Sequence, residues 1–166
     1  MKTKSKIVSI VAAFMLVFGA TSAFAETSDS VSIQNLVNYE SEPNDSYETA
    51  DTAVNYNMDW GTNQGYINRA GDIDFWHLLT SNAASYTIDL LSPQNFDFNF
   101  VVLEKIPGQE GYTEVARSNS QNSSARLTVP GIKSDGSVPN YYVMVYGQYG
   151  SFNTTSPYTL AITPEY

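Results

Sequence analysis

Short runs of strand-forming residues, separated by turn-forming residues, limit the folds open to this chain more than any other feature. Tyr, Phe, Val, Ile and Thr fill the runs, and Gly, Pro, Asn and Ser fill the breaks. Short strands at this spacing predict an all-β fold, an antiparallel β-sandwich of about eight strands. The expected strands are Gly65–Asn68, Ile73–Thr80, Ser85–Ser92, Asp97–Lys105, Thr113–Ser118, Ser124–Pro130, Asn140–Gly147 and Pro157–Thr163. One helical turn is expected before them, over Ser46–Ala53, with Ser46 as its cap.

Apolar residues recur at every second position in most of these runs, so one face of each strand is predicted to lie in the core. Two sheets with one such row per strand would pack about 10 Å apart. The predicted inward rows are Trp76 and Leu78; Tyr86, Ile88 and Leu90; Phe98, Phe100 and Val102; Ala125, Leu127 and Val129; and Tyr158, Leu160 and Ile162.

The expected strand Asn140–Gly147 is apolar on both faces. Its inward row would be Tyr141, Val143 and Val145, which leaves a second apolar row on the opposite face. Either a loop or the N-terminal segment covers this second row, or the row is an exposed aromatic patch for a ligand, a role that suits tyrosine. The candidate ligand-binding residues are Tyr142, Met144, Tyr146 and, just beyond the strand, Tyr149.

The first 25 residues have the pattern of a secretory signal peptide. They contain three lysines, an apolar run, and Ala23-Phe24-Ala25 as a small-x-small cleavage sequence. The apolar run is shorter than the roughly 20 residues of a membrane span. We therefore expect a secreted, extracellular protein, with a flexible segment over residues 26–39 and one β-sandwich domain over residues 40–166.

The chain behind the expected leader is strongly acidic. The leader holds three of the eight basic residues and no acid, so five basic residues remain against 17 acidic ones, a net charge near −12. Such a charge repels nucleic acid phosphates and anionic membrane surfaces, and neither is an expected partner. The chain has no cysteine, so stability must come from a core and from any bound ion.

Two acidic motifs lie on either side of the first expected strand. Residues 40–45 read Glu-Ser-Glu-Pro-Asn-Asp, and Asp72 and Asp74 lead into the next strand. Residues two positions apart in an extended chain point the same way, so these two aspartates could converge. Calcium takes about six to eight oxygen ligands, which carboxylates and amides supply. Solvated acidic loops have the same composition, so the residues alone leave both interpretations open.

Several motifs, in this order and spacing, resemble the bacterial pre-peptidase C-terminal domain. They are Glu-x-Glu-Pro-Asn-Asp-Ser at 40–46, Gly-Tyr-Ile at 65–67, Gly-Asp-x-Asp-Phe-Trp at 71–76, Tyr-Thr-Ile at 86–88, Phe-Asp-Phe at 96–98, Tyr-Tyr-Val-Met-Val-Tyr at 141–146 and Ser-Pro-Tyr-Thr-Leu at 156–160. The resemblance covers residues 40–163 and extends to the collagen-binding modules of clostridial collagenases. It implies a jelly-roll-like β-sandwich of the kind appended to secreted peptidases.

The resemblance also implies a calcium site. In the collagen-binding modules, an acidic segment and an Asp-containing strand start bind calcium. The positions here that match this ligand pattern are Glu40, Glu42, Asn44, Asp45 and Asp74. Gly71 stands where those modules have a second aspartate, and the neighbouring Asp72 is the sixth candidate ligand.

The resemblance bears on the aromatic row as well. In the collagen-binding modules the strand equivalent to Asn140–Gly147 faces collagen, and Tyr142, Met144 and Tyr146 match its positions. Gln148 replaces a further tyrosine of those modules, so the expected ligand is an extracellular protein or polysaccharide rather than collagen in particular.

The sequence offers little for catalysis. His77 is the single histidine and lies within a strand, and the chain has neither cysteine nor a nucleophile or zinc motif. The main prediction is a monomeric, calcium-binding module that is not an enzyme and that binds an extracellular protein or polymer. The alternatives are an accessory or chaperone-like partner of a secreted peptidase and, third, a carboxylate-dependent hydrolase.

Overall fold

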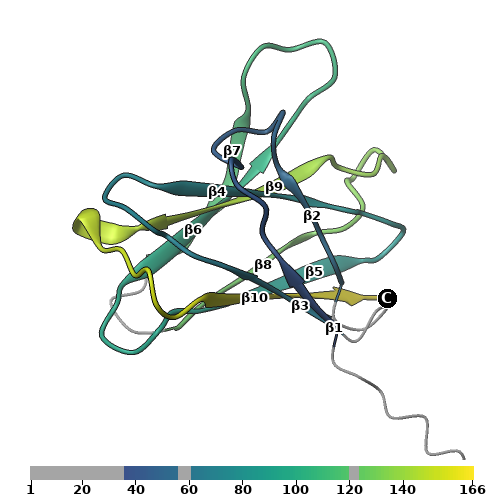
Figure 1. Ribbon diagram of the computed structural model, residues 1–166. Coiled ribbons are helices and arrows are strands. Elements are labelled where there is room, and N and C mark those ends of the chain that lie inside the picture. Colours follow the sequence, from purple (N-terminus) through teal and green to yellow (C-terminus); the bar gives the residue numbers. More distant parts are fainter. Residues whose placement is uncertain (1–35, 56–60, 120–123) are drawn as a thin grey trace, which may run out of the picture. The chain divides into compact units, whose positions relative to one another are not determined.

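The computed structural model describes residues 36–55, 61–119 and 124–166, which form a sandwich of two five-stranded sheets (Figure 1). The prediction of an all-β sandwich is confirmed. In spatial order, the first sheet contains β1 (Leu36–Tyr39), β3 (Gly61–Gly65), β10 (Tyr158–Glu165), β5 (Ser85–Leu91) and β8 (Ser124–Pro130). The second contains β2 (Asp51–Ala53), β4 (Ile73–Leu78), β9 (Tyr141–Gly147), β6 (Phe98–Glu104) and β7 (Thr113–Arg117).

Two pairs of strands, β1 with β3 and β2 with β4, run parallel, and the other pairs in the described sheets are antiparallel. β1 and β2 are the edge strands of different sheets. The segment between them, residues 40–50, therefore passes from one sheet to the other. This crossing segment contains the first acidic motif.

The core lies between the sheets and is built from the predicted rows. Trp76, Tyr86, Phe98, Tyr141 and Tyr158 are among its largest fully buried side chains. Burial of one large apolar side chain stabilises the fold by roughly 1.5–3 kcal/mol, so these rows dominate the folding free energy. Of the residues in the predicted rows, Leu127 is only half-buried and packs at the margin.

The N-terminal half of the described chain departs from the sequence-based predictions. The strand expected at Gly65–Asn68 lies four residues earlier, as β3, because its inward positions are Gly61, Asn63 and Gly65 rather than apolar residues. Asn63 is buried and satisfied there, since its amide donates to the carbonyls of Val54 and Leu160. A Cβ at Gly65 would collide with the Glu40 carboxylate and the Tyr158 hydroxyl, so glycine is required for close approach.

Two further differences concern the edge strands. Residues 36–39, expected within a flexible segment, form β1, whose register is set by pairing with β3 rather than by an apolar pattern of its own. The expected helix over Ser46–Ala53 is a single turn closed by the Thr49 N–H on the Ser46 carbonyl (3.2 Å), followed by β2. The predicted signal peptide lies outside the described residues. None of the described residues forms a helix long and apolar enough to cross a membrane.

Candidate metal centre

The acidic motifs meet because backbone hydrogen bonds hold the crossing segment against both sheets. At its start, the Glu40 N–H donates to the Gln64 carbonyl in β3 (2.9 Å). Four residues later, the Asn44 carbonyl accepts from the Phe75 N–H in β4 (2.9 Å). The segment therefore lies over the end of the sandwich where β4 begins.

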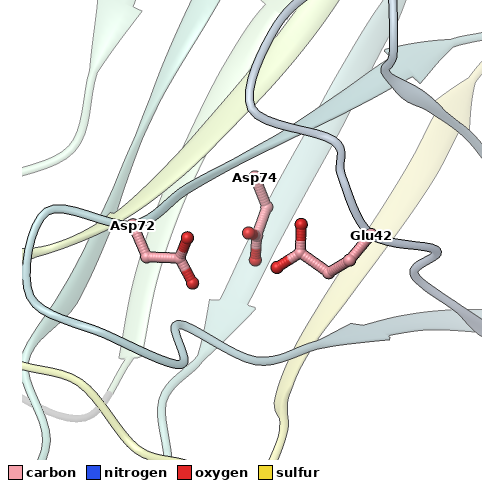
Figure 2. Close-up of side chains that lie close together, drawn as sticks. All are labelled: Glu42, Asp72 and Asp74. Carbon is pink, nitrogen blue, oxygen red and sulfur yellow. The ribbon is translucent and has the colours of Figure 1, made fainter.

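Three carboxylates converge at this point, those of Glu42, Asp72 and Asp74 (Figure 2). One oxygen from each lies within 4.8 Å of the others. Asp72 and Asp74 are buried, and Glu42 closes the group from the solvent side. The sequence-based prediction that the two aspartates converge is confirmed by this geometry.

Asp74 is held by a buried chain of hydrogen bonds from the core. The Tyr158 hydroxyl of β10 donates to Asp74 Oδ2 (2.7 Å) and accepts from Trp76 Nε1 (2.8 Å). Because the indole N–H can only donate, the tyrosine proton must go to Asp74. The chain uses one oxygen of Asp74 and leaves Oδ1 without a donor.

Several buried oxygens at the centre lack a hydrogen-bond donor. They are Glu40 Oε2, Asn44 Oδ1, Asp72 Oδ1 and Asp74 Oδ1. Asn44 is fully buried, and its Nδ2 donates to Asp51 Oδ2 (3.2 Å), which fixes which end of the amide is left unpaired. Asp72 Oδ1 lies in an ion pair with Arg69, which leaves three oxygens without a partner. An unpartnered buried acceptor costs about 1–3 kcal/mol, so these three favour a bound proton or cation.

Burial and mutual repulsion make the carboxyls of Asp74 and Glu40 hard to ionise without a cation. Burial, and then the negative charge of Glu40, raises the pKa of Asp74 from its usual 3.8 to about 9. Burial likewise raises the pKa of Glu40 above its usual value. Like charges forced together away from water disfavour the ionised form, and a bound cation removes this penalty.

The donor set fits a hard divalent cation. The carboxylates of Glu42, Asp72 and Asp74 converge, and the crossing segment adds buried oxygens of Glu40 and Asn44, so the groups that could hold an ion all offer oxygen. Calcium takes about six to eight such oxygens, whereas magnesium is usually held by only one or two carboxylates. The residues present therefore suit calcium better than magnesium.

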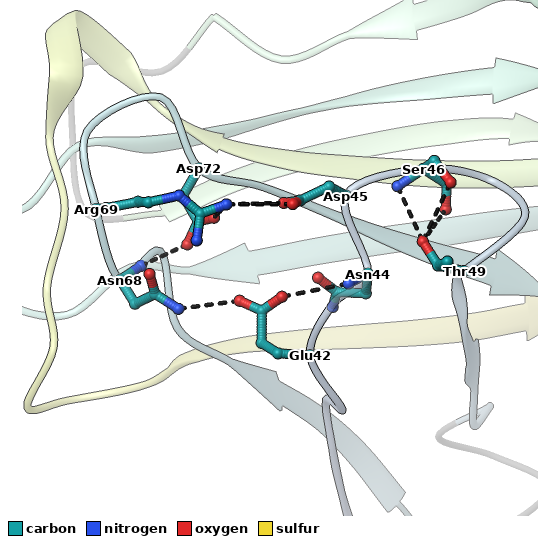
Figure 3. Close-up of polar contacts among 8 residues, drawn as sticks. All are labelled: Glu42, Asn44, Asp45, Ser46, Thr49, Asn68, Arg69 and Asp72. Carbon is teal, nitrogen blue, oxygen red and sulfur yellow. Dashed lines mark hydrogen bonds and ion pairs between the residues drawn. The ribbon is translucent and has the colours of Figure 1, made fainter.

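Asp45 differs from the other predicted ligands. Its side chain is partly exposed and forms an ion pair with Arg69, with Arg69 Nη2 3.1 Å from Asp45 Oδ2 (Figure 3). The same guanidinium nitrogen lies 3.1 Å from Asp72 Oδ1, without hydrogen-bond geometry. The structure thus places Asp45 at the rim, beside the described residues that could hold an ion rather than among them.

Three residues that sequence reasoning missed position the candidate ligands. Asp51 accepts from the Ser41 N–H (2.8 Å) and orients Asn44, while Asn68 Nδ2 donates to Glu42 Oε1 (2.9 Å). Tyr158 orients Asp74 from 84 residues away. Asp51 and Asn68 belong to no motif that the sequence analysis recognised. The alternation of apolar residues correctly assigned Tyr158 to the core but did not indicate that its hydroxyl would bind Asp74.

The predicted aromatic row on β9 is not an exposed patch. Tyr142 is only 9% exposed, and Met144 and Tyr146 are half-buried. Tyr149 is 89% exposed, but it lies on the short turn η1 (Gln148–Gly150) with a φ of 54°, beyond the strand. The prediction of an exposed row is therefore wrong at Tyr142, and the alternative of a covered row is correct there.

Rings from three other segments cover Tyr142. His77 stacks on it with ring centroids 4.7 Å apart, and Tyr47 and Tyr112 meet it edge-on at 6.2 and 6.3 Å. Lys105 Nζ lies 4.9 Å from the centroid of the Tyr47 ring. We call Tyr47, Phe75, His77, Tyr112 and Tyr142 the aromatic cluster. Tyr47 belongs to the crossing segment, so part of the surface that buries Tyr142 comes from a region without an apolar sequence pattern.

His77 has a structural environment. Besides its stacking on Tyr142, its Nε2 lies 2.9 Å from Asn140 Oδ1. Neither contact is with a carboxylate or a hydroxyl that could form a catalytic pair. Among the described residues, the histidine therefore belongs to the packing of the second sheet.

Comparison with known proteins gives limited similarity. No protein-family model matches the chain, and no curated protein matches it. A solved structure of the pre-peptidase C-terminal domain of collagenase from Bacillus anthracis is similar with a TM-score of 0.47 and 14% identity, over 78% of this chain and 97% of that one. This is the domain type that the sequence motifs resemble. The Aeromonas hydrophila protein PliG, a periplasmic inhibitor of g-type lysozyme, is similar with a TM-score of 0.41 and 15% identity, over 78% and 96%.

Proposed function

We propose that this protein is a secreted β-sandwich module, stabilised by calcium, that binds an extracellular protein or polymer and is not an enzyme. One observation supports the calcium part: the carboxylates of Glu42, Asp72 and Asp74 converge at the end of the sandwich, where buried oxygens of Glu40, Asn44 and Asp74 have no hydrogen-bond donor. Only a proton or a cation can pair with acceptors alone. The raised pKa of Asp74 keeps a proton there in the ion-free protein near neutral pH, and calcium at the millimolar concentration found outside the cell would displace it.

Calcium at this centre would tie the N-terminal crossing segment to both sheets. Glu42 and Asn44 belong to the crossing segment, and Asp72 and Asp74 precede and begin β4. Asp74 is in turn bonded to Tyr158 in the first sheet. These residues converge only in the folded state, so the ion would bind that state and raise its stability by mass action.

The same geometry argues for a module rather than a hydrolase. A pair of carboxyls that hydrolyses a glycosidic bond must flank an open slot for the sugar. Asp72 and Asp74 are 1% and 0% exposed, and they face each other and Glu42. Closed in this way, the acids can enclose an ion but cannot reach both sides of a scissile bond.

Thermal unfolding in calcium and in EDTA tests the proposal. Extracellular calcium modules bind at about 0.1–1 mM, so a few millimolar calcium should stabilise the fold by about 1–2 kcal/mol. This corresponds to a melting temperature roughly 2–6 °C higher than in EDTA. Asp74→Asn and Glu42→Gln, which keep the side-chain shape, should each abolish the difference.

Glu110→Gln is the matched control, because Glu110 is an exposed acid outside the centre. It should leave the calcium-dependent difference intact. Equal melting curves for the parent protein in calcium and in EDTA would contradict the proposal, and so would an unchanged difference in Asp74→Asn.

A further inference from the structure

A pocket adjoins the candidate metal centre on its solvent side. It has a volume of about 300 Å³ and lies beyond the ends of β1 and β3. Two tyrosines, three uncharged polar residues and two candidate metal ligands form its walls: Tyr39, Tyr66, Gln64, Asn68, Thr154, Glu40 and Glu42. This volume is at the lower end of the range for small-molecule sites, which suits one compact ligand unit.

The two tyrosines give the pocket its apolar surface. Tyr39 ends the edge strand β1 and is 62% exposed, and Tyr66, just after β3, is partly exposed. Both residues line the pocket together with polar side chains, in contrast to Tyr142, which other rings cover. An exposed ring beside hydrogen-bonding groups is the composition of a site that binds an amphipathic ligand.

The charge of the pocket lining indicates which class of ligand the pocket can bind. This inference rests on the proposed function, because it assumes that calcium occupies the centre. The lining contains no basic side chain, so an anion has no partner there. With calcium on Glu40 and Glu42, their charge is neutralised and the remaining lining is uncharged. Amides and hydroxyls that both donate and accept then face a ligand that must also do both.

We infer that this pocket binds a sugar unit of an extracellular glycan, with its C–H faces against Tyr39 and Tyr66 and its hydroxyls toward Gln64, Asn68 and Thr154. A sugar ring combines apolar faces with a rim of hydroxyls that donate and accept, which matches the tyrosines and the neutral polar groups together. The inferred ligand surface is therefore this pocket beside the candidate metal centre, and not the row on β9 that the sequence indicated.

Binding to an array of immobilised neutral and acidic oligosaccharides, in millimolar calcium and in EDTA, tests this inference. We expect retention on neutral glycans in calcium and its loss in EDTA. Tyr39→Ala and Tyr66→Ala should each weaken binding roughly tenfold, as expected for loss of a ring contact. Thr154→Val, which keeps the side-chain shape and removes the hydroxyl, should weaken it by several fold.

Tyr149→Ala is the control, since Tyr149 is highly exposed and lies outside the pocket lining. It should bind as the parent protein does. All the variants should retain the calcium-dependent rise in melting temperature, which separates loss of the pocket from loss of the fold or of the ion.

Three results would overturn the inference. The first is that no glycan is retained although calcium raises the melting temperature; this result would refute the glycan site but not the proposed metal centre. Another is equal glycan binding by the parent and both tyrosine variants. The third is binding of a lysine-rich peptide in EDTA that calcium displaces, which would make the pocket a site for cationic side chains. Absence of any calcium effect on melting would instead refute the proposed function itself.

Discussion

The candidate metal centre and the aromatic cluster both contain residues of β4 and of the crossing segment, and their interactions differ. At the metal centre, buried oxygens of Asn44 and Asp74 have no partner within the described protein. In the aromatic cluster, Tyr142 is enclosed by His77, Tyr47 and Tyr112. A buried acceptor without a donor is satisfied only by a proton or a cation, whereas a ring packed by its neighbours needs no further partner.

The comparison separates the predicted metal ligands from Tyr142, which the sequence had offered as a ligand-binding residue. If it is correct, changes in the aromatic cluster should alter stability regardless of calcium, and changes at the metal centre should act through calcium. The four predictions below test this difference, from the largest expected effect to the smallest.

Tyr142→Ala should cause the largest loss. Truncating a buried aromatic residue costs about 3–5 kcal/mol, because it leaves a cavity among its neighbours. Urea unfolding should show this loss equally in calcium and in EDTA. A loss of less than about 1 kcal/mol would mean that the ring is not packed as the structure shows, and would reopen a surface role for β9.

Tyr158→Phe should weaken calcium binding about tenfold to a hundredfold, the usual effect of removing a group that orients a metal ligand. The variant frees Asp74 Oδ2 and leaves Trp76 Nε1 without its acceptor. Titration calorimetry at a temperature where the variant is fully folded isolates the effect on the ion. If the variant lowers stability in EDTA but binds calcium as the parent does, Tyr158 is a core residue without a role at the centre.

The calcium-dependent gain in melting temperature should grow with pH. In the ion-free folded protein the pKa of Asp74 is raised to about 9, against a usual 3.8. Between these values the unfolded chain carries fewer protons than the folded one, so the stability of the ion-free protein falls as pH rises. With calcium bound, Asp74 is ionised when folded, and its part of this pH dependence disappears.

Melting curves in calcium and in EDTA at several pH values between about 5 and 8 measure this effect. The calcium-dependent difference in stability should widen by up to about 1.4 kcal/mol per pH unit where calcium saturates the site. Asp74→Asn is the control, because it should show no gap at either end. A gap that is constant or narrows with pH would contradict the raised pKa of Asp74.

Asp45→Asn should have the smallest effect. The ion pair of Asp45 with Arg69 is exposed, and such pairs contribute about 0–1 kcal/mol. The variant should retain most of the calcium-dependent rise in melting temperature. Loss of that rise would show that Asp45 is a ligand after all, as the sequence pattern suggested.

The predictions from sequence succeeded where the signal was local. Alternation placed β5, β6 and β8 within a residue or two, because each of these strands carries its own apolar row. It missed β1 and β2, which are short and defined by parallel pairing to β3 and β4. It displaced β3, whose buried positions are filled by two glycines and an asparagine.

For the candidate site, the sequence correctly indicated convergence of Asp72 and Asp74, because spacing of two residues fixes their common direction. The sequence could not tell that Asn44 is buried at the centre and Asp45 is not, because the two residues are adjacent in one acidic motif. The side chain of Asn44 is buried, whereas that of Asp45 pairs with Arg69 at the surface. That choice depends on where the turn at residues 68–72 lies, and the turn comes from a distant part of the chain.

The amino-acid sequence by itself determined the β-sandwich and the concentration of acids at one end of it, since strand alternation and local charge act over a few residues. The tertiary structure alone decided which acids face inward, that Tyr158 holds Asp74, and that Tyr142 is covered while Tyr39 and Tyr66 are open. These outcomes depend on contacts between segments tens of residues apart, whose geometry is set when the two sheets pack against each other.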